Sequence, residues 1–211
     1  MAEPEPEPTV FVVDDDPSVR KSTERLIRSM GFGVRTFASA REFLADARVD
    51  GPACLVLDVR MPGLDGLDLQ RELAQAGIHI PIVFVTGHGS IPMTVRAMKA
   101  GAAEFLTKPV RPRDLGAAVR AAIERARESH RARLATDMLR ERYDRLTPRE
   151  REVMAFVVSG AHNRQIAGEL ATSERTIKFH RAHIMEKMEA TSLTELVQMA
   201  DRLCLATRAA Q

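Results

Sequence analysis

The sequence predicts two domains: a doubly wound α/β sandwich with five parallel strands, followed by an all-α domain of four helices that contains a helix-turn-helix. Short apolar runs alternate with amphipathic helical stretches from Thr9 to about Arg125, which is typical of the α/β class. After Thr147 the apolar pattern is helical throughout, and a short helix is followed by a tight turn and a long helix. With 211 residues, of which 45% are hydrophobic, the chain is large enough for two cores.

The α/β domain is expected over residues 9–125, and its helix starts are well marked. Asp16 precedes a first-turn proline, and Ser39 begins a capping box. Pro112 suits the first turn of a fifth helix. The five predicted strands are Val10–Val13, Gly33–Phe37, Cys54–Asp58, Ile82–Thr86 and Glu104–Thr107.

The segments outside this domain differ in composition. Residues 1–8 contain Glu-Pro repeats, and because proline prevents helix formation and nothing there can be buried, we expect a short disordered tail. Between Gly116 and Pro148 there is neither glycine nor proline, so a long helix is expected. Its apolar stripe ends at Ala126, and residues 126–145 are therefore predicted to be a solvated helical linker.

The all-α domain is expected over residues 146–211. Its first helix begins with a capping box at Thr147, followed by proline at the first helical position. A short helix over Asn163–Leu170, a turn and a long helix over Glu174–Met188 form the helix-turn-helix. Another capping box at Ser192 begins a fourth helix that ends near Leu203.

Composition excludes several classes of protein. The net charge of +2 is too small to indicate nucleic-acid binding by itself. Cys54 and Cys204 give neither a disulfide framework nor metal-ligand spacing, which fits a reducing cytosol. No apolar run approaches the roughly 18 residues of a membrane span, and the amino terminus lacks the basic and then apolar pattern of a signal peptide. We therefore expect a cytoplasmic protein without a membrane segment.

Polar side chains lie where four of the predicted strands end. Acidic residues follow the first strand at Asp14–Asp16, and Asp58 ends the third strand. Taken singly, such a run is often a helix cap, and Asp58 could be a plain turn aspartate. However, the fourth strand ends at Thr86, and Lys108 follows the fifth. Because the carboxyl ends of parallel strands meet at one edge of a sheet, these groups together would suit a divalent cation and a phosphoryl group.

This set of residues resembles the receiver domain of two-component response regulators, which has a flavodoxin-like fold. The resemblance covers about residues 9–125, and the stretch Val85–Ala102 (VTGHGSIPMTVRAMKAGA) is similar to the FixJ branch. It rests on the order and spacing of the paired aspartates Asp14 and Asp15, Asp58, Thr86 and Lys108-Pro109.

The second half resembles the LuxR-type helix-turn-helix that FixJ-like regulators carry. The motifs lie between Leu146 and about Leu203. They are Leu146–Val153 (LTPREREV), Gly160 with Asn163, Ile166 and Ala167, and Thr176–Arg181 (TIKFHR). Together, the two halves resemble a response regulator of the NarL/FixJ family.

For the first domain the resemblance implies a role for each polar group. Asp58 would be the phosphoacceptor, taking a phosphoryl group from the histidine of a sensor kinase. Asp15 and Asp58 would bind Mg²⁺ directly together with the backbone carbonyl of Arg60, while Asp14 would act through a bound water. Lys108 would pair with the phosphoryl group, and the bond from Lys108 to the following proline is a candidate cis peptide.

The resemblance also implies a switch. Phosphorylation adds a charge of about −1.5 to −2, and Thr86 would donate its hydroxyl to one of the new oxygens. An aromatic side chain then rotates into the vacated space in this family, and Phe105 occupies that position; the alternative is that Phe105 is an ordinary core residue. Asp16 is expected to cap the first helix, with a supporting role at the metal as the alternative.

For the second domain the resemblance implies that the long helix enters the major groove of DNA. Lys178, Phe179 and Ala182 would face base edges, with guanine acceptors and thymine methyl groups as targets. The other positions are expected to contact phosphates, with a solvated surface charge as the alternative for each arginine. They are Asn163, Arg164, Arg175, Thr176, Arg181 and Lys187.

The sequence therefore predicts a phosphorylation-activated transcription factor and not an enzyme. The expected partners are a sensor histidine kinase, promoter DNA, RNA polymerase and a second copy of the chain. Two copies would contact each other through about Pro92–Val110 of the receiver and through the last helix of the DNA-binding half. One alternative is a switch whose helical domain binds a protein such as RNA polymerase instead of DNA. Another is a Mg²⁺-dependent phosphatase, although Arg60 stands where a general acid would be needed.

Overall fold

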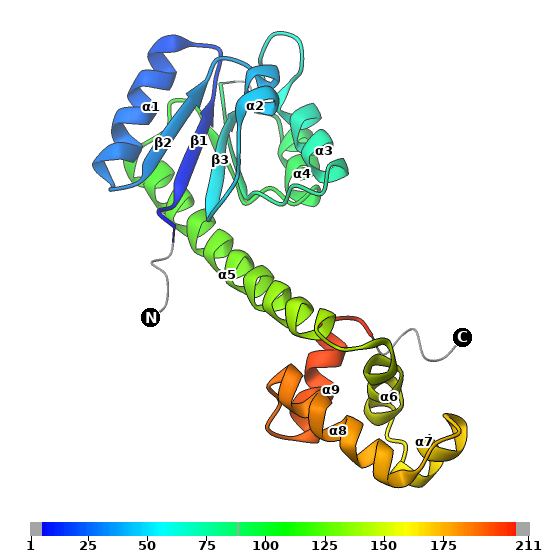
Figure 1. Cartoon of the computed structure of the whole chain (residues 1–211). Coiled ribbons are helices and arrows are strands. Elements are labelled where there is room, and N and C mark those ends of the chain that lie inside the picture. The colour runs from blue at the N-terminus through cyan, green and yellow to red at the C-terminus, as the bar shows by residue number, and fades with distance from the viewer. Residues whose placement is uncertain (1–5, 88, 206–211) are drawn as a thin grey trace. The chain divides into compact units, whose positions relative to one another are not determined.

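A computed structural model of the chain describes residues 6–87 and 89–205. Its backbone contacts divide the chain into two compact units, residues 1–130 and 131–211. The first unit is built around a parallel sheet, and the second consists of helices (Figure 1). Most of the predicted tail lies outside the described residues, and residues 6–8 have no regular secondary structure. Within the described part of the chain, no helix is both long and apolar enough to cross a membrane.

The sheet confirms the predicted fold class, since its five strands are parallel and lie in the order β2-β1-β3-β4-β5. The strands are β1 (Thr9–Val13), β2 (Gly33–Phe37), β3 (Ala53–Asp58), β4 (Ile82–Thr86) and β5 (Glu104–Thr107). β1 and β3 are neighbours in register, with Val13 opposite Leu57. Asp14, which follows β1, and Asp58, the last residue of β3, therefore emerge side by side.

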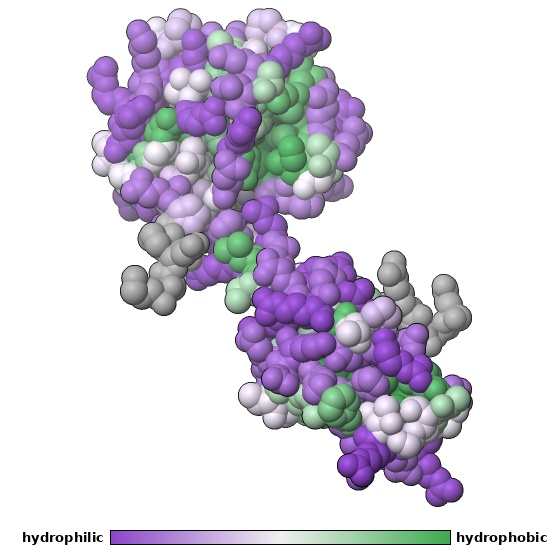
Figure 2. Space-filling view, viewed as in Figure 1, coloured by the Kyte–Doolittle hydropathy of each residue, from purple (hydrophilic) through white to green (hydrophobic). Residues whose placement is uncertain are grey.

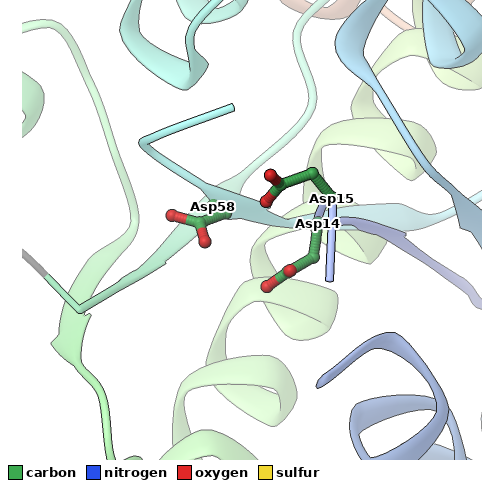
Figure 3. Close-up of side chains that lie close together, drawn as sticks. All are labelled: Asp14, Asp15 and Asp58. Carbon is green, nitrogen blue, oxygen red and sulfur yellow. The ribbon is translucent and has the colours of Figure 1, made fainter. Parts of the chain in front are cut away.

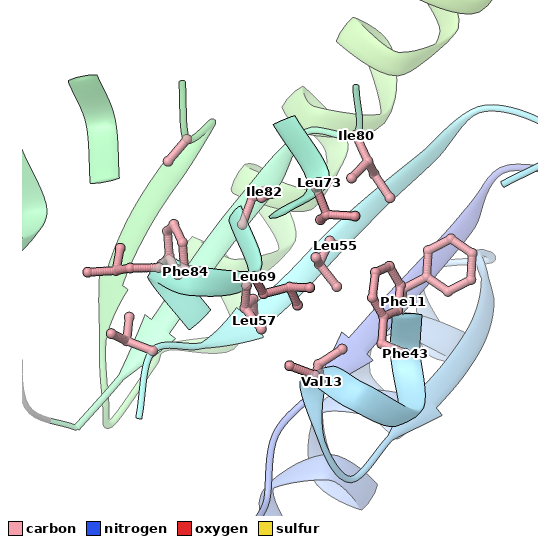
Figure 4. Packing of buried hydrophobic residues seen from close by; sticks show 14 of the residues in the cluster. Phe11, Val13, Phe43, Leu55, Leu57, Leu69, Leu73, Ile80, Ile82 and Phe84 are labelled. Atoms are coloured by element: carbon pink, nitrogen blue, oxygen red, sulfur yellow. The ribbon is translucent and has the colours of Figure 1, made fainter. Parts of the chain in front are cut away.

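Helices cover both faces of the sheet. They are α1 (Pro17–Ser29), α2 (Ala40–Asp46), α3 (Gly66–Gln75), α4 (Ile91–Lys99) and α5 (Pro112–Asp144). Residues of β3 alternate between the faces. Leu55 packs with residues of α2, α3 and α4 (Figure 4). Val56 belongs to the cluster on the other face, with residues of α1 and α5. The chain thus leaves β1 toward one face and β3 toward the other. Such a switch point creates a crevice at the carboxyl ends of these two strands.

Gly66, the first residue of α3, brings that helix close to the end of β3. Its N–H donates to the carbonyl oxygen of Val59 at 2.9 Å. A Cβ at this position would overlap the carbonyl oxygen of Asp58, so only glycine fits without moving the backbone. The start of α3 therefore constrains the backbone at the end of β3, where Asp58 lies.

The helical unit has a single apolar core. Its helices are α6 (Pro148–Val158), α7 (Asn163–Glu169), α8 (Glu174–Met188) and α9 (Leu193–Arg202). Ile166 of α7, Ile177 and Ile184 of α8 and Leu196 of α9 are fully buried in this core. Ser173 caps α8 by accepting from the N–H of Thr176 at 3.1 Å, which fixes the tight turn of the predicted helix-turn-helix. Hydrophilic side chains make up most of the visible face of the helical unit (Figure 2).

The final turns of α5 differ from the solvated linker that the sequence predicts. α5 is continuous over its whole length, as expected from the absence of glycine and proline. Leu139, however, is buried in the core of the helical unit, and Tyr143 packs against that core. Arg151 of α6 lies over the ring of Tyr143 at 5.0 Å. The end of the linker helix is thus part of the helical unit.

Glu150 is a buried acid that joins two helices of this unit. Its side chain completes the predicted capping box by accepting from the N–H of Thr147 at 2.8 Å. The same oxygen, Oε2, accepts from Lys187 Nζ of α8 at 2.6 Å. Burial by itself would raise the pKa of Glu150, but the hydrogen bonds from Lys187 and Thr147 hold it below its usual value. Glu150 is therefore charged and paired at neutral pH.

Replacing Glu150 by Gln should lower the free energy of unfolding by about 1–3 kcal/mol at neutral pH, because an amide cannot pair with the charge of Lys187. A lowered pKa in the folded protein stabilises it above the pKa of the unfolded chain, and this stabilisation is lost as the pH falls through the folded value. The difference between wild type and Glu150→Gln should therefore shrink in acid.

Urea unfolding followed by circular dichroism at neutral and acidic pH measures this difference. Glu152→Gln is a matched control on α6, because Glu152 is exposed and forms a surface ion pair with Arg149. A stability difference for Glu150→Gln that stayed constant from neutral to acidic pH would contradict the assigned pairing.

Candidate functional site

Three carboxylates converge at the carboxyl ends of β1 and β3. Asp14, Asp15 and Asp58 each place a ligand oxygen within 4.8 Å of the others (Figure 3). Asp14 is 4% exposed and Asp58 is 7% exposed, whereas Asp15 is open to solvent. This is the group that the sequence predicted, and the adjacent pairing of β1 with β3 brings it together.

Lys108 supplies the positive charge of this site. Its Nζ donates to Asp14 Oδ2 at 2.7 Å and to Asp58 Oδ2 at 2.6 Å. The backbone places the side chain there, since the Lys108 N–H donates to the carbonyl oxygen of Thr86 at 2.8 Å. The peptide bond between Lys108 and Pro109 is cis, as predicted. One amine thus joins carboxylates that follow two different strands.

Burial and ion pairing shift the pKa values of Asp14 and Lys108 in opposite directions. Burial raises the pKa of Asp14 above its usual value, even though hydrogen bonds from Lys108 and the Asp16 N–H work against this. Burial would lower the pKa of Lys108, but its hydrogen bonds to Asp14 and Asp58 raise it overall. The amine is therefore held in its charged form, and removing it would leave two buried carboxylates facing each other.

Backbone groups and one arginine fix the carboxylates in place. Asp58 Oδ1 accepts from the Arg60 N–H at 3.0 Å, and Asp14 Oδ1 accepts from the Asp16 N–H at 2.9 Å. Asp16 caps α1 through the N–H groups of its second and third following residues, in agreement with the predicted cap. Arg20 of α1 donates from Nη1 to the carbonyl oxygen of Asp14 at 2.6 Å. The role of Arg20 was not predicted, because the sequence alone does not show which way α1 turns this side chain.

The donor set fits a hard divalent cation. Carboxylate oxygens from Asp14, Asp15 and Asp58 are the ligands that Mg²⁺ prefers, and few protein ligands suit an ion that keeps several waters. An acidic cluster of this kind is typical of Mg²⁺ binding in receiver-like sites. The exposed Asp15 side chain leaves one side of the cluster open to solvent.

The two predicted switch residues lie on the neighbouring strands. Thr86 ends β4 fully buried and is paired in register with Thr107 of β5. Phe105 of β5 is half-buried, and its ring centroid lies 5.9 Å from that of Phe84. A Cβ on Gly89 would come within 3.2 Å of the Phe105 ring, so the glycine leaves clearance beside the aromatic side chain.

In the helical unit, α8 has one buried face and one exposed face. Lys178, Phe179 and Ala182, which were predicted to face DNA bases, are all exposed, and Ile177 and Ile184 are buried on the other side. Of the residues predicted to contact phosphate, two are exposed and four are partly buried. The exposed pair is Arg164 and Arg175, and the partly buried group is Asn163, Thr176, Arg181 and Lys187.

Lys187, which was predicted to contact phosphate, has an internal partner. Its Nζ is bound to the buried carboxylate of Glu150, so its charge is already balanced inside the protein. Thr176 also has an internal partner, because its hydroxyl lies 2.9 Å from Ser173 Oγ. These two side chains contribute to holding α8 in place, which residue type and spacing alone could not indicate.

Family profiles match both units. The profile described as the response regulator receiver domain matches residues 10–120. The profile described as bacterial regulatory proteins of the luxR family matches residues 144–200. The acidic site lies in the first match, and α8 lies in the second.

Similar proteins extend over nearly the whole chain. Nodulation protein W of Bradyrhizobium diazoefficiens is 52% identical over 194 residues, which cover 92% of this chain and 86% of that protein. Response regulator protein TodT of Pseudomonas putida is 45% identical with the same coverage of both chains. The solved structure of the response regulator StyR has a TM-score of 0.82 and 48% identity, and the match covers 93% of this chain and 99% of that one. This chain therefore belongs to the NarL/FixJ family of response regulators, which join a receiver domain to a LuxR-type DNA-binding domain.

Proposed function

We propose that this protein accepts a phosphoryl group on Asp58 from a sensor histidine kinase and, once phosphorylated, dimerises and binds promoter DNA to control transcription. The observation that carries the proposal is the Lys108 amine, which lies 2.6 Å from Asp58 and 2.7 Å from Asp14 at the crevice of a receiver-type sheet. A nucleophilic carboxylate, a neighbouring acid and a fixed cation are the parts that phosphoryl transfer to an aspartate needs.

In this reaction a carboxylate oxygen of Asp58 attacks the phosphorus of a phosphohistidine. The reacting phosphohistidine carries a proton on its other ring nitrogen. The P–N bond breaks as the new P–O bond forms, and the electron pair of the P–N bond stays on the ring nitrogen. This leaves a neutral imidazole on the kinase and an acyl phosphate on Asp58. The amine of Lys108 would move from the carboxylate to an oxygen of the bound phosphoryl group, so its charge stays paired. The N–H of Arg60, which donates to Asp58 Oδ1 at 3.0 Å, would keep the carboxylate oriented throughout.

A divalent cation belongs to this proposal as a bound cofactor. Asp15, Asp58 and the backbone carbonyl of Arg60 would hold Mg²⁺ directly, and Asp14 would hold it through a water. When bound, Mg²⁺ would offset the negative charge that the phosphoryl oxygens bring to three nearby carboxylates. The raised pKa of Asp14 is consistent with a site that gains from an additional positive charge.

Thr86 and Phe105 would report the phosphorylated state. The Thr86 hydroxyl sits at the end of β4, next to the strand that carries Asp58, and would donate to a phosphoryl oxygen. Drawing Thr86 and its loop inward would vacate space beside β5, into which the ring of Phe105 can turn. The clearance left by Gly89 supports this movement, because a side chain there would meet the ring.

The surface that would receive a second copy is the outer side of α4 with β5. α4 exposes the large hydrophobic residues Ile91, Val95 and Met98, and 83% of the Ile91 surface is exposed. An apolar helix face of this kind is typical of a protein contact. Since α4 follows the loop after Thr86, a change in that loop would alter this face first.

Binding of DNA would use the exposed face of α8. Lys178 would donate to guanine acceptors, and Phe179 and Ala182 would contact thymine methyl groups. Arg164, Arg175 and Arg181, together with Asn163 and Thr176 in the first turn of α8, would lie against phosphates. RNA polymerase would then be recruited by the DNA-bound dimer.

Asp58→Asn should abolish phosphorylation by acetyl phosphate, because the amide cannot form an acyl phosphate. Phosphate incorporation measured by intact-protein mass spectrometry should give one acid-labile phosphate on the wild type and none on the variant. Sedimentation should show a dimer only for the phosphorylated wild type. Asp68→Asn, on the outer side of α3, is the matched control and should behave as wild type. Phosphorylation of Asp58→Asn would mean that another residue is the acceptor.

Lys178→Ala should weaken binding to a target duplex by about 1–3 kcal/mol and relax its sequence preference, because one base contact is lost. Arg181→Ala should weaken binding to all duplexes alike. It should also reduce the slope of log binding constant against log salt concentration by about one, the value for one phosphate contact. Fluorescence anisotropy at several salt concentrations separates the two effects, with Arg41→Ala on α2 as a control that should change neither. Unchanged binding in both α8 variants would favour the alternative in which the helical domain binds a protein partner.

A further inference from the structure

Phe179 is a large aromatic side chain on the exposed face of α8. It has 58% of its surface exposed, whereas Ile177, Ile184 and Met188 of the same helix are buried. A free phenyl ring on a surface is unfavourable in water and adopts several rotamers. Its contacts with neighbouring side chains therefore determine what it can recognise.

His183, one turn after Phe179 on α8, packs against that ring. The two ring centroids lie 4.0 Å apart with an interplanar angle of 52°. His180 also neighbours Phe179, but its ring centroid is 6.1 Å away. An i, i+4 pair of aromatic rings on a helix restricts both side chains. Phe179 is therefore supported on one side and open on the other.

Glu150 of α6 lies beside His183. Its Oε2 accepts from Lys187 Nζ and from the Thr147 N–H. Its Oε1 lies 3.8 Å from His183 Nδ1. The carboxylate is itself 3% exposed and held by the capping box, so it is a rigid partner. A chain of contacts thus runs from the start of α6 through His183 to the exposed ring on α8.

We propose that His183 is a positioning residue, which holds the ring of Phe179 where it can make the contact with the thymine C5-methyl group assigned to it above. The proposal rests on the DNA-binding function described above. A methyl group is the apolar feature of the major-groove edge, and it distinguishes thymine from the other three bases. The Phe179 ring, already restrained by His183, loses less conformational freedom on contact than a free ring does. This increases the difference in affinity that one methyl group can produce.

The test compares thymine with deoxyuridine, which lacks only the C5-methyl group. The phosphorylated full-length protein is first used to enrich duplexes from a random-sequence library. The enriched duplex is then made with each thymine replaced in turn by deoxyuridine, and both forms are titrated with the same protein sample. At one or more positions in each half-site, the wild-type protein should bind the deoxyuridine duplex about fourfold more weakly than the thymine duplex. This is the effect of one buried methyl group.

Phe179→Ala and His183→Ala should reduce this ratio toward one. His183→Phe should restore it, because a ring at position 183 can still support Phe179. His180→Ala is the matched control and should keep the wild-type ratio. The ratio compares two duplexes with one protein, so partial unfolding of a variant lowers both affinities and leaves the ratio unchanged.

The possible failures are separable. A wild-type protein that enriches no duplex would contradict the DNA-binding function and with it this proposal. Enrichment without any position that distinguishes thymine from deoxyuridine would contradict methyl recognition alone. If Phe179→Ala lost the discrimination and His183→Ala retained it in full, the positioning role of His183 would be wrong.

Discussion

The hydrogen bonds from Lys108 to Asp14 and Asp58 are the interaction on which the receiver domain depends. The three residues are far apart in sequence, and only the strand order β2-β1-β3-β4-β5 brings them together. Two buried carboxylates this close would repel each other without the amine, and burial already raises the pKa of Asp14. The same amine is positioned to follow a phosphoryl group on Asp58. In the proposed function, the stability of the unphosphorylated site and the recognition of the phosphorylated one would use this single cation.

The DNA-binding domain is organised around a second buried charge of opposite sign. Glu150 joins the start of α6 to α8 through Lys187 and faces His183, which supports Phe179. The helix that carries the proposed DNA contacts is therefore held by a polar anchor as well as by its apolar core. A buried and paired carboxylate fixes one register between two helices, since any sliding would leave its charge unpaired.

Local signals in the sequence predicted the strands, the helix caps and the acidic site, because each depends on residues close together in the chain or on motif order. What was missed depends on partners that are distant in sequence. The ion pair of Lys187 with Glu150 was not predicted, because Glu150 lies 37 positions earlier in the chain. Leu139 lies beyond the point where the apolar stripe of its own helix ends, and residues of the helical unit bury it. The bond from Arg20 to the backbone of Asp14 likewise follows from how α1 packs, which periodicity alone does not give.

In the proposed function, charge at Asp58 controls DNA affinity through the hydroxyl of Thr86. The most direct measurement is the affinity of wild type and Thr86→Ala for one enriched duplex, with and without acetyl phosphate, alongside the phosphate content of each protein. Wild type should gain about tenfold in affinity on phosphorylation, a coupling within the usual range of 1–3 kcal/mol. Thr86→Ala should take up the phosphate and gain little affinity. A gain equal to that of wild type in phosphorylated Thr86→Ala would contradict the account.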